Sequence, residues 1–177
     1  MKKEQHPKLQ LKFLGGAGTV TGSKILLKTQ NHQVLIDCGL FQGLKELRLL
    51  NWKKPPFHVP ELDAVILTHG HLDHCGYLPV LTQYGYKGPI YTTEPTRDVT
   101  EIILRDSAKI QEEDAAEANK YGYSKHRPAK PLYGERDVDH TMPLFRTCPQ
   151  EKWIELNEEI RFRFRNSGHI LGSSLIE

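Results

Sequence analysis

Residues 68–76 of the chain are THGHLDHCG, and they directly follow the apolar run DAVIL at 63–67. Within this stretch, His69, His71, Asp73 and His74 place three imidazoles and one carboxylate close together. A buried strand that ends in a loop lets such side chains converge on one point. Imidazole and carboxylate are ligands of zinc and similar divalent ions, at about 2.0 to 2.2 Å. The stretch therefore predicts a metal site in a loop between a strand and a helix.

The spacing within the motif predicts how the ligands divide. His69 and His71 are two residues apart, and in extended backbone such residues point the same way, so both can bind one ion. Asp73 and His74 then face a second ion. Two ions about 3.5 to 4 Å apart can activate a hydroxide and stabilise charge on a phosphate oxygen. A histidine-rich surface loop is the alternative, but it gives no reason for this order of residues behind a buried strand.

The residues before the motif predict a three-stranded meander. Apolar residues recur in 9–14 (LQLKFL), 23–28 (SKILLK) and 33–37 (QVLID). The loop GGAGTVTGS at 15–23 lacks the glycine spacing of nucleotide-binding loops, and a strand follows it instead of a helix. We expect its glycines to permit positive φ and a close approach to the metal site. A short helix is predicted around 44–50.

The residues after the motif predict alternating helices and strands. We expect a helix within 76–85, a strand at 89–92, a long helix from Pro95 to about Asn119, and a helix within 134–145. Segments 152–156 and 160–166 are predicted to pair, with arginines on one face that is either solvent-exposed or phosphate-facing. A new strand is predicted in the last residues.

The segment 121–134, YGYSKHRPAKPLYG, is basic and aromatic. We expect an exposed loop. The alternative is a contact with nucleic acid, in which Tyr121, Tyr123 and Tyr133 stack on bases.

Composition indicates one ordinary folded domain. Of the 177 residues, 38% are hydrophobic and 26% charged, which excludes an intrinsically disordered chain. The net charge of +2 is compatible with a polyanionic substrate but is weaker than that of a dedicated nucleic-acid binder. No apolar run suits a signal peptide or a membrane span. Three widely spaced cysteines fit a reducing cytoplasm, with Cys38 and Cys75 expected to be buried, although Cys75 beside His74 is an alternative ligand.

The motif resembles the His-x-His-x-Asp-His signature of the metallo-β-lactamase fold, a four-layer αββα sandwich of hydrolases. Asp37 in VLIDCG resembles the first motif of that family, and His169 in SGHILGSS resembles the third. Together with GGAGTVTGS and with DCGLFQG at 37–43, these residues resemble the β-CASP branch. That branch contains nucleases acting on RNA or DNA, including ribonuclease J and the pre-mRNA 3′-end endonuclease. The resemblance runs from about Leu11 to the end of the chain.

The resemblance implies an α/β fold, the first half of the αββα sandwich, with a mixed β-sheet flanked by helices. Residues 1–177 are expected to form the N-terminal portion of that domain, without the β-CASP domain and the C-terminal half. His69, His71 and His169 would bind the first metal, Asp73 and His74 the second, and Asp37 would orient the ligand loop. A bridging aspartate and a last histidine are expected beyond residue 177. We therefore expect one Zn²⁺ ion or none here, where the full-length family binds two.

The implied function is hydrolysis of nucleic-acid phosphodiesters by metal-bound hydroxide in the cytoplasm, with RNA, or else single-stranded DNA, as the partner. Asp73 or the histidine beyond the chain would be the catalytic proton donor. A small-molecule ester, thioester or lactam hydrolase is an alternative that the motifs around His169 and the glycine loop disfavour. Another alternative is a truncated, non-catalytic metal-binding module whose copies associate through an unfinished sheet edge.

Overall fold

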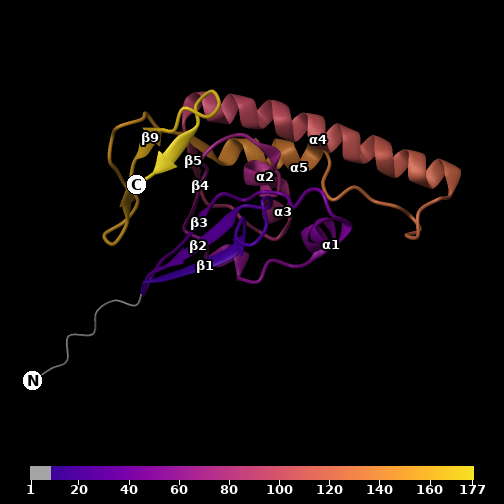
Figure 1. Cartoon of the computed structure of the whole chain (residues 1–177), viewed down its shortest axis with the longest axis horizontal. Coiled ribbons are helices and arrows are strands. Elements are labelled where there is room, and N and C mark those ends of the chain that lie inside the picture. The colour runs from indigo at the N-terminus through magenta and orange to yellow at the C-terminus, as the bar shows by residue number, and fades with distance from the viewer. Residues whose placement is uncertain (1–8) are drawn as a thin grey trace, which may run out of the picture.

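The computed structural model describes residues 9–177, and Figure 1 shows their elements. Residues 1–8, which we expected to contain no signal peptide, lie outside the described part. The strands are β1 (Gln10–Gly15), β2 (Lys24–Lys28), β3 (Gln33–Ile36), β4 (Ala64–Ile66), β5 (Ile90–Thr92), β6 (Phe145–Thr147), β7 (Ile154–Glu155), β8 (Arg161–Phe162), β9 (Phe164–Asn166) and β10 (Ser174–Ile176). The α-helices are α1 (Lys45–Arg48), α2 (Leu72–Cys75), α3 (Leu78–Gln83), α4 (Glu94–Tyr121) and α5 (Glu135–Thr141), and short 3-10 helices cover Leu49–Trp52, Val59–Glu61 and Met142–Leu144.

A six-stranded mixed sheet in the order β1-β2-β3-β4-β5-β6 forms the centre of the molecule. The strands β1, β2 and β3 pair antiparallel, as the predicted meander requires, and β4, β5 and β6 continue parallel to β3. Leu11 lies opposite Leu27, and Leu27 opposite Val34, so apolar side chains share one face of the sheet. The predicted mixed sheet with flanking helices is confirmed.

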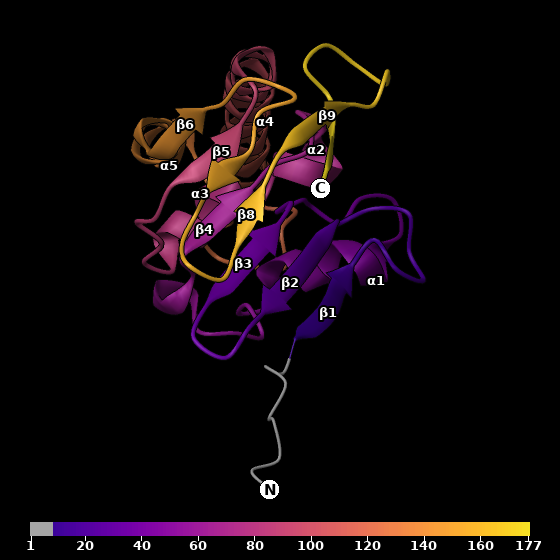
Figure 2. The same ribbon diagram turned by 90° about the vertical axis from the view of Figure 1, so that its left-hand side faces the viewer.

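The sheet separates two apolar cores (Figure 2). On the helix side, Val65 and Ile90 pack with buried residues of α3, α4 and α5. On the opposite face, β8 and β9 cross in front of the sheet, and Phe162 and Phe164 pack against Ile66. Each buried side chain of this kind contributes about 1.5 to 3 kcal/mol. Packing on both faces of the sheet therefore fixes β4 and β5, whose C-terminal ends lead into the candidate site.

The long helix α4 runs across the molecule in Figure 1. Its N-cap is Thr93, whose hydroxyl accepts a hydrogen bond from the backbone N–H of Thr96, and Pro95 occupies the first turn, where no amide donor is needed. Gly122 ends the helix with a φ of 68°. The predicted helix is confirmed and extends from Glu94 to Tyr121. In the described part of the chain, no helix combines the length and apolar character needed to span a bilayer.

One strand differs from the prediction. Residues 145–147 were not expected to form a strand, and Phe145 was included in the preceding helix, but they form β6, which pairs in parallel with β5. Pro143 lies in the 3-10 turn that follows α5, and the chain becomes extended at Phe145. A strand of three residues with one buried side chain is too short to show a period in the sequence.

The basic aromatic segment 121–134 is exposed only in part. Tyr121 and Tyr123 are exposed, but Tyr133 is 1% exposed and donates a hydrogen bond to Ser107 Oγ on α4 (2.8 Å). Stacking of bases on Tyr133 is therefore excluded, because its ring belongs to the core.

The arginine-rich segment 160–166 forms two short strands, of which β8 pairs with β7 and β9 with β10. The guanidinium groups of Arg161 and Arg163 both lie 4.7 Å from the ring centroid of Trp153. Arg163 Nε also donates to Glu177 Oε2 (2.8 Å). The arginine face is thus largely engaged within the chain.

Candidate metal centre

The predicted ligand stretch lies where β4 ends and α2 begins. His71 is the N-cap of α2 and has extended backbone, with φ −67° and ψ 146°. His69 and His71 therefore precede the helix, as predicted. Asp73 and His74 lie inside its single turn, so the prediction of a loop is wrong for these two residues. Neither residue belongs to the group of histidines that converge, although the His74 ring lies 4.0 Å from that of His69.

Three histidines meet with one ring nitrogen each: His69, His71 and His169. His71 Nδ1 lies 3.1 Å from His69 Nε2 and 3.2 Å from His169 Nε2. The three nitrogens lie within 4.8 Å of one another. The ring centroids form a nearly regular triangle with sides of 4.9, 4.9 and 5.1 Å. The structure thus brings together the first ligand set expected from the sequence.

This donor set fits a divalent metal ion. Tetrahedral zinc with bonds of about 2.0 to 2.1 Å places neighbouring nitrogens about 3.3 Å apart, close to the two separations from His71 Nδ1. Hydrogen bonds among the rings explain only one of these two separations, because one N–H on His71 can donate to only one of its two neighbours. Three nitrogen ligands leave a fourth position for water or substrate, which is the arrangement of catalytic zinc sites.

Asp37 lies behind the motif, buried at 3% exposure, in the loop after β3. Its Oδ1 accepts hydrogen bonds from the backbone N–H (2.9 Å) and the hydroxyl (2.8 Å) of Thr68. Its Oδ2 accepts from His74 Nδ1 (2.7 Å) and from Ser23 Oγ (3.2 Å). These bonds hold a backbone conformation with φ of 58°, which is uncommon for a residue with a side chain.

The Asp37 carboxylate also sets the tautomers of two histidines. Since the Thr68 hydroxyl donates its proton to Asp37, its oxygen accepts from His69 Nδ1–H (2.9 Å). His69 Nε2 is then unprotonated and free to bind a metal ion. His74 donates Nδ1–H to Asp37, which leaves Nε2 as the nitrogen available to a metal ion. Such partners of ligand histidines are a regular part of metal sites.

Burial, reinforced by the neighbouring histidines, lowers the pKa of His69 to about 4. The ring is therefore neutral at ordinary pH, as metal binding requires. For His74, burial alone would lower the pKa, but the hydrogen bond and charge of Asp37 and the charge of Asp73 raise it above its ordinary value. A metal ion at His74 Nε2 would take the place of that proton.

Asp73 and His74 lie beside the three histidines but form a separate pair. His74 Nε2 is 3.7 Å from Asp73 Oδ2, and both side chains are half-buried. The rings of His74 and His69 are 4.0 Å apart. Two ligands make a weaker site than three. The expectation of at most one tightly bound ion remains a prediction.

His169 reaches the site from a loop between β9 and β10, and hydrogen bonds fix that loop. The buried Ser173 hydroxyl accepts from the backbone N–H of His169 (3.1 Å) and of Ile170 (3.0 Å). The hydroxyl of Thr93 donates to the carbonyl of Gly172 (2.8 Å), which joins the loop to the start of α4. The third histidine is therefore positioned by a segment that is remote in sequence from the other two.

The glycine loop approaches the site as expected. Gly16, Gly18 and Gly22 have φ of 70°, 72° and 81°. The loop ends at Ser23, whose backbone N–H donates to the carbonyl of Asp73 (2.9 Å). Because a side chain at Gly22 would overlap the ring of Phe41, that position admits only glycine.

Both cysteines near the site are buried. Cys38 and Cys75 are 0% exposed, and burial raises the pKa of Cys38 to about 12 and that of Cys75 further. The thiol of Cys75 donates to the carbonyl of Gly70 (3.4 Å). The prediction of buried cysteines is confirmed, and Cys75 points to backbone instead of the histidines.

Sequence reasoning missed the hydroxyl groups of the site, which belong to Ser23, Thr68, Thr93 and Ser173. Thr68 carried one signal, its place between a buried strand and the first histidine. The others act through contacts that appear only when distant segments meet.

Comparison with known proteins shows the family of the chain. Residues 18–144 match the model of the metallo-beta-lactamase superfamily. The chain belongs to the metallo-beta-lactamase superfamily. Its fold is similar to that of the crystal structure of the metallo-beta-lactamase SMB-1, with a TM-score of 0.53 and 16% identity, over 93% of this chain and 53% of that one.

Among curated proteins, the chain is similar to transcription termination factor FttA of Methanocaldococcus jannaschii, at 34% identity over 171 residues. It is also similar to a ribonuclease of Thermus thermophilus, at 37% identity over 162 residues. These matches cover 94% and 92% of this chain, but 24% and 33% of the two relatives. The chain thus spans about a quarter to a third of the length of these relatives. The expected kinship with RNA-processing nucleases of this fold is confirmed.

Proposed function

We propose that the chain forms the metal-binding part of a hydrolase that cleaves RNA phosphodiester bonds. The observation that carries the proposal is the convergence of His69, His71 and His169 on one point, with a fourth position open. RNA as the substrate is supported by the relative named as a ribonuclease. Single-stranded DNA has the same phosphodiester group and is the second substrate to compare.

The group that fits this site is Zn²⁺, one ion bound tightly by the three histidines. When bound, it supplies acidified water and a positive charge for the phosphate oxygens. Thr68 keeps His69 Nε2 unprotonated, and His71 Nδ1 lies 3.1 Å from that nitrogen. Asp37 fixes the orientation through Thr68 and His74.

Asp73 is the candidate proton donor for the leaving oxygen. Its carboxylate is half-buried beside the His74 ring, so it borders the centre without belonging to the group of three histidines. From this position Asp73 would pass a proton to the leaving alkoxide. In a site that holds the second, weaker ion, the Asp73 carboxylate would instead be a ligand of that ion.

The test measures cleavage of labelled single-stranded RNA with zinc and with a chelator, in parallel with elemental analysis. The test compares this chain with a longer chain of the relatives' length. It also includes the His71→Ala variant of each of the two. His140→Ala, an exposed position on α5, is the matched control. We expect about one zinc per chain, and RNA cleavage that needs both zinc and His71. Zinc-dependent cleavage of a carboxylic ester but not of RNA would overturn the proposal, and two stoichiometric ions would contradict the single tight site.

A further inference from the structure

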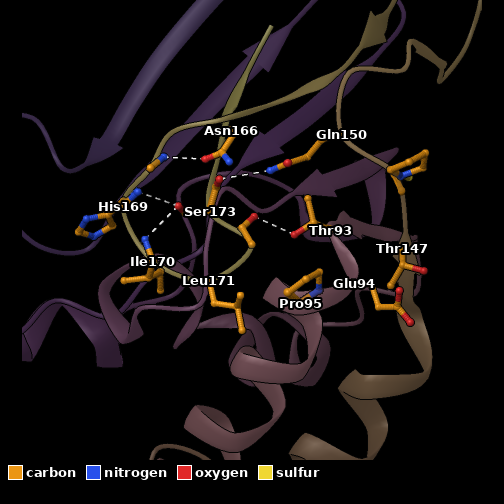
Figure 3. A pocket seen from close by; sticks show the side chains of 14 residues that line it. Thr93, Glu94, Pro95, Thr147, Gln150, Asn166, His169, Ile170, Leu171 and Ser173 are labelled. Atoms are coloured by element: carbon orange, nitrogen blue, oxygen red, sulfur yellow. Dashed lines mark hydrogen bonds between the residues drawn. The ribbon is translucent and has the colours of Figure 1, made fainter.

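A pocket of about 820 Å³ lies beside the metal centre (Figure 3). Its walls are the start of α4, residues 147–150 after β6, and the loop 166–173. His169 belongs both to this lining and to the three histidines that converge. In Figure 3 the His169 ring points away from Thr93 and Pro95. A substrate bound at the centre would reach the pocket by crossing one loop.

The lining of the pocket does not suit a phosphate group. Among the residues that line it in the described part of the chain, none is lysine or arginine, and Glu94 supplies a carboxylate. Pro95, Pro149, Ile170 and Leu171 provide apolar surface. This lining disfavours an anion and suits a partly apolar ligand that can form hydrogen bonds. Its size lies within the usual 300–1,000 Å³ of small-ligand sites.

Two side-chain amides on one wall are each fixed by hydrogen bonds within the chain. Asn166 Oδ1 accepts from the backbone N–H of Gly168 (2.8 Å), and Gln150 Nε2 donates to Ser174 Oγ (3.0 Å). Within residues 9–177, Asn166 Nδ2 and Gln150 Oε1 have no hydrogen-bond partner. Ser174, which accepts from Gln150, pairs with Asn166 between β10 and β9, so the two amides come from neighbouring positions of the wall, and in Figure 3 both lie across the pocket from Pro95. The wall therefore presents one donor group beside one acceptor.

We propose that this pocket binds a nucleobase of the RNA, next to the phosphate at the metal centre. The proposal rests on the proposed function and adds a subsite to it. The edge of a nucleobase carries donors and acceptors side by side, which asparagine and glutamine amides recognise. Its flat ring would lie against the proline and aliphatic side chains. Asn166 and Gln150 would thus bind the base, while the histidines hold the metal ion.

Adenosine is a suitable probe because it has a base and no phosphate that could bind zinc. In NMR spectra of the zinc-loaded chain, adenosine is expected to shift the side-chain amide signals of Asn166 and Gln150 in a saturable manner. Ribose and inorganic phosphate should leave these signals unchanged. Failure of adenosine to shift them, or equal shifts with ribose, would overturn the proposal.

Asn166→Asp is the decisive variant. A carboxylate still accepts from the Gly168 N–H but cannot donate to a base, so adenosine should bind about tenfold more weakly. Asn157→Asp is the matched control, since Asn157 Oδ1 likewise accepts a backbone N–H, from Ile160 (2.8 Å), in the β7–β8 turn outside the pocket. Unchanged affinity in Asn166→Asp would contradict the subsite. RNA cleavage without adenosine binding would refute only the subsite, whereas adenosine binding without any RNA cleavage would refute only the proposed function.

Discussion

Asp37 orients more than one histidine near the candidate metal centre. Its carboxylate contacts Thr68 and His74 directly and His69 through the Thr68 hydroxyl. One buried group therefore orients a histidine of each ligand set. Its role was expected from the family resemblance, because spacing alone could not connect residue 37 with residues 69–74.

Asp37→Asn tests this role. The amide oxygen can still accept from Thr68. Its NH₂ group, however, would oppose the Nδ1–H of His74, donor against donor, or push the His74 ring out of place. We expect zinc affinity to fall by about 10-fold to 100-fold, the usual effect of losing such a partner. Competition with a chromogenic chelator measures the affinity. Asp98→Asn, an exposed carboxylate paired with Arg97 on α4, is the control, and equal zinc affinity in both variants would contradict the role.

The residues of the site differ in how far sequence could reveal them. His69, His71, Asp73 and His74 were evident because they are local, and a strand-to-helix junction follows from the pattern around them. His169 lies far along the chain and was assigned only through the family resemblance. Ser173 could not be found in the sequence, because serine is common and its function here depends on two backbone amides of its own loop.

At the scale of elements, the structure depends on how the loop between β9 and β10 joins α4. Long elements were predictable: α4 shows a cap, a first-turn proline and a final glycine. The parallel pairing of β6 with β5 was not, because a parallel partner is chosen by the packing of the helices between the strands. The same limit applies to the contact between Thr93 and Gly172.

Two glycine substitutions measure that contact. Gly172 (φ 78°) and Gly168 (φ 70°) both have left-handed backbone, so alanine costs about 1 to 2 kcal/mol at either position. A Cβ at Gly172 would lie 2.5 Å from the backbone nitrogen of Thr96, whereas one at Gly168 meets nothing within 4 Å. We expect urea unfolding to show that Gly172→Ala is less stable than Gly168→Ala by about 1 to 3 kcal/mol. Equal losses would mean that the loop does not press on α4.

At the scale of the whole molecule, His32 links the main sheet to the smaller strands. Its Nδ1 lies 3.3 Å from Asp63 Oδ1, and its Nε2 lies 3.5 Å from Glu158 Oε1 in the β7–β8 turn. The neighbouring carboxylates of Asp63 and then of Glu158 raise the pKa of His32. The protonated ring is therefore favoured in the folded chain.

This linkage makes stability depend on pH in a defined direction. The contribution of His32 is complete below its unfolded pKa of about 6.5 and is lost as pH rises through its higher folded pKa. We expect His32→Gln to destabilise the chain more at about pH 5.5 than at about pH 8.5. Thermal unfolding at both values measures the difference. His140→Gln, exposed on α5, should leave the pH dependence intact, and a pH-independent effect of His32→Gln would refute the linkage.

Association of copies through a sheet edge remains a prediction at this scale. β1 and β6 are the outer strands of the main sheet. Leu11 and Phe13 on β1 are exposed apolar side chains, so this edge offers surface that another chain could cover.

His71 and His169, whose ring nitrogens lie 3.2 Å apart, are separated by 98 positions in the chain. An ion bound to both would act as a reversible cross-link, because it closes a long loop that the unfolded chain leaves open. Its binding free energy would then become folding free energy for the β9–β10 hairpin. Zinc concentration would control how often that hairpin detaches from the sheet. The ion would thus stabilise the fold of the molecule in addition to supporting its chemistry.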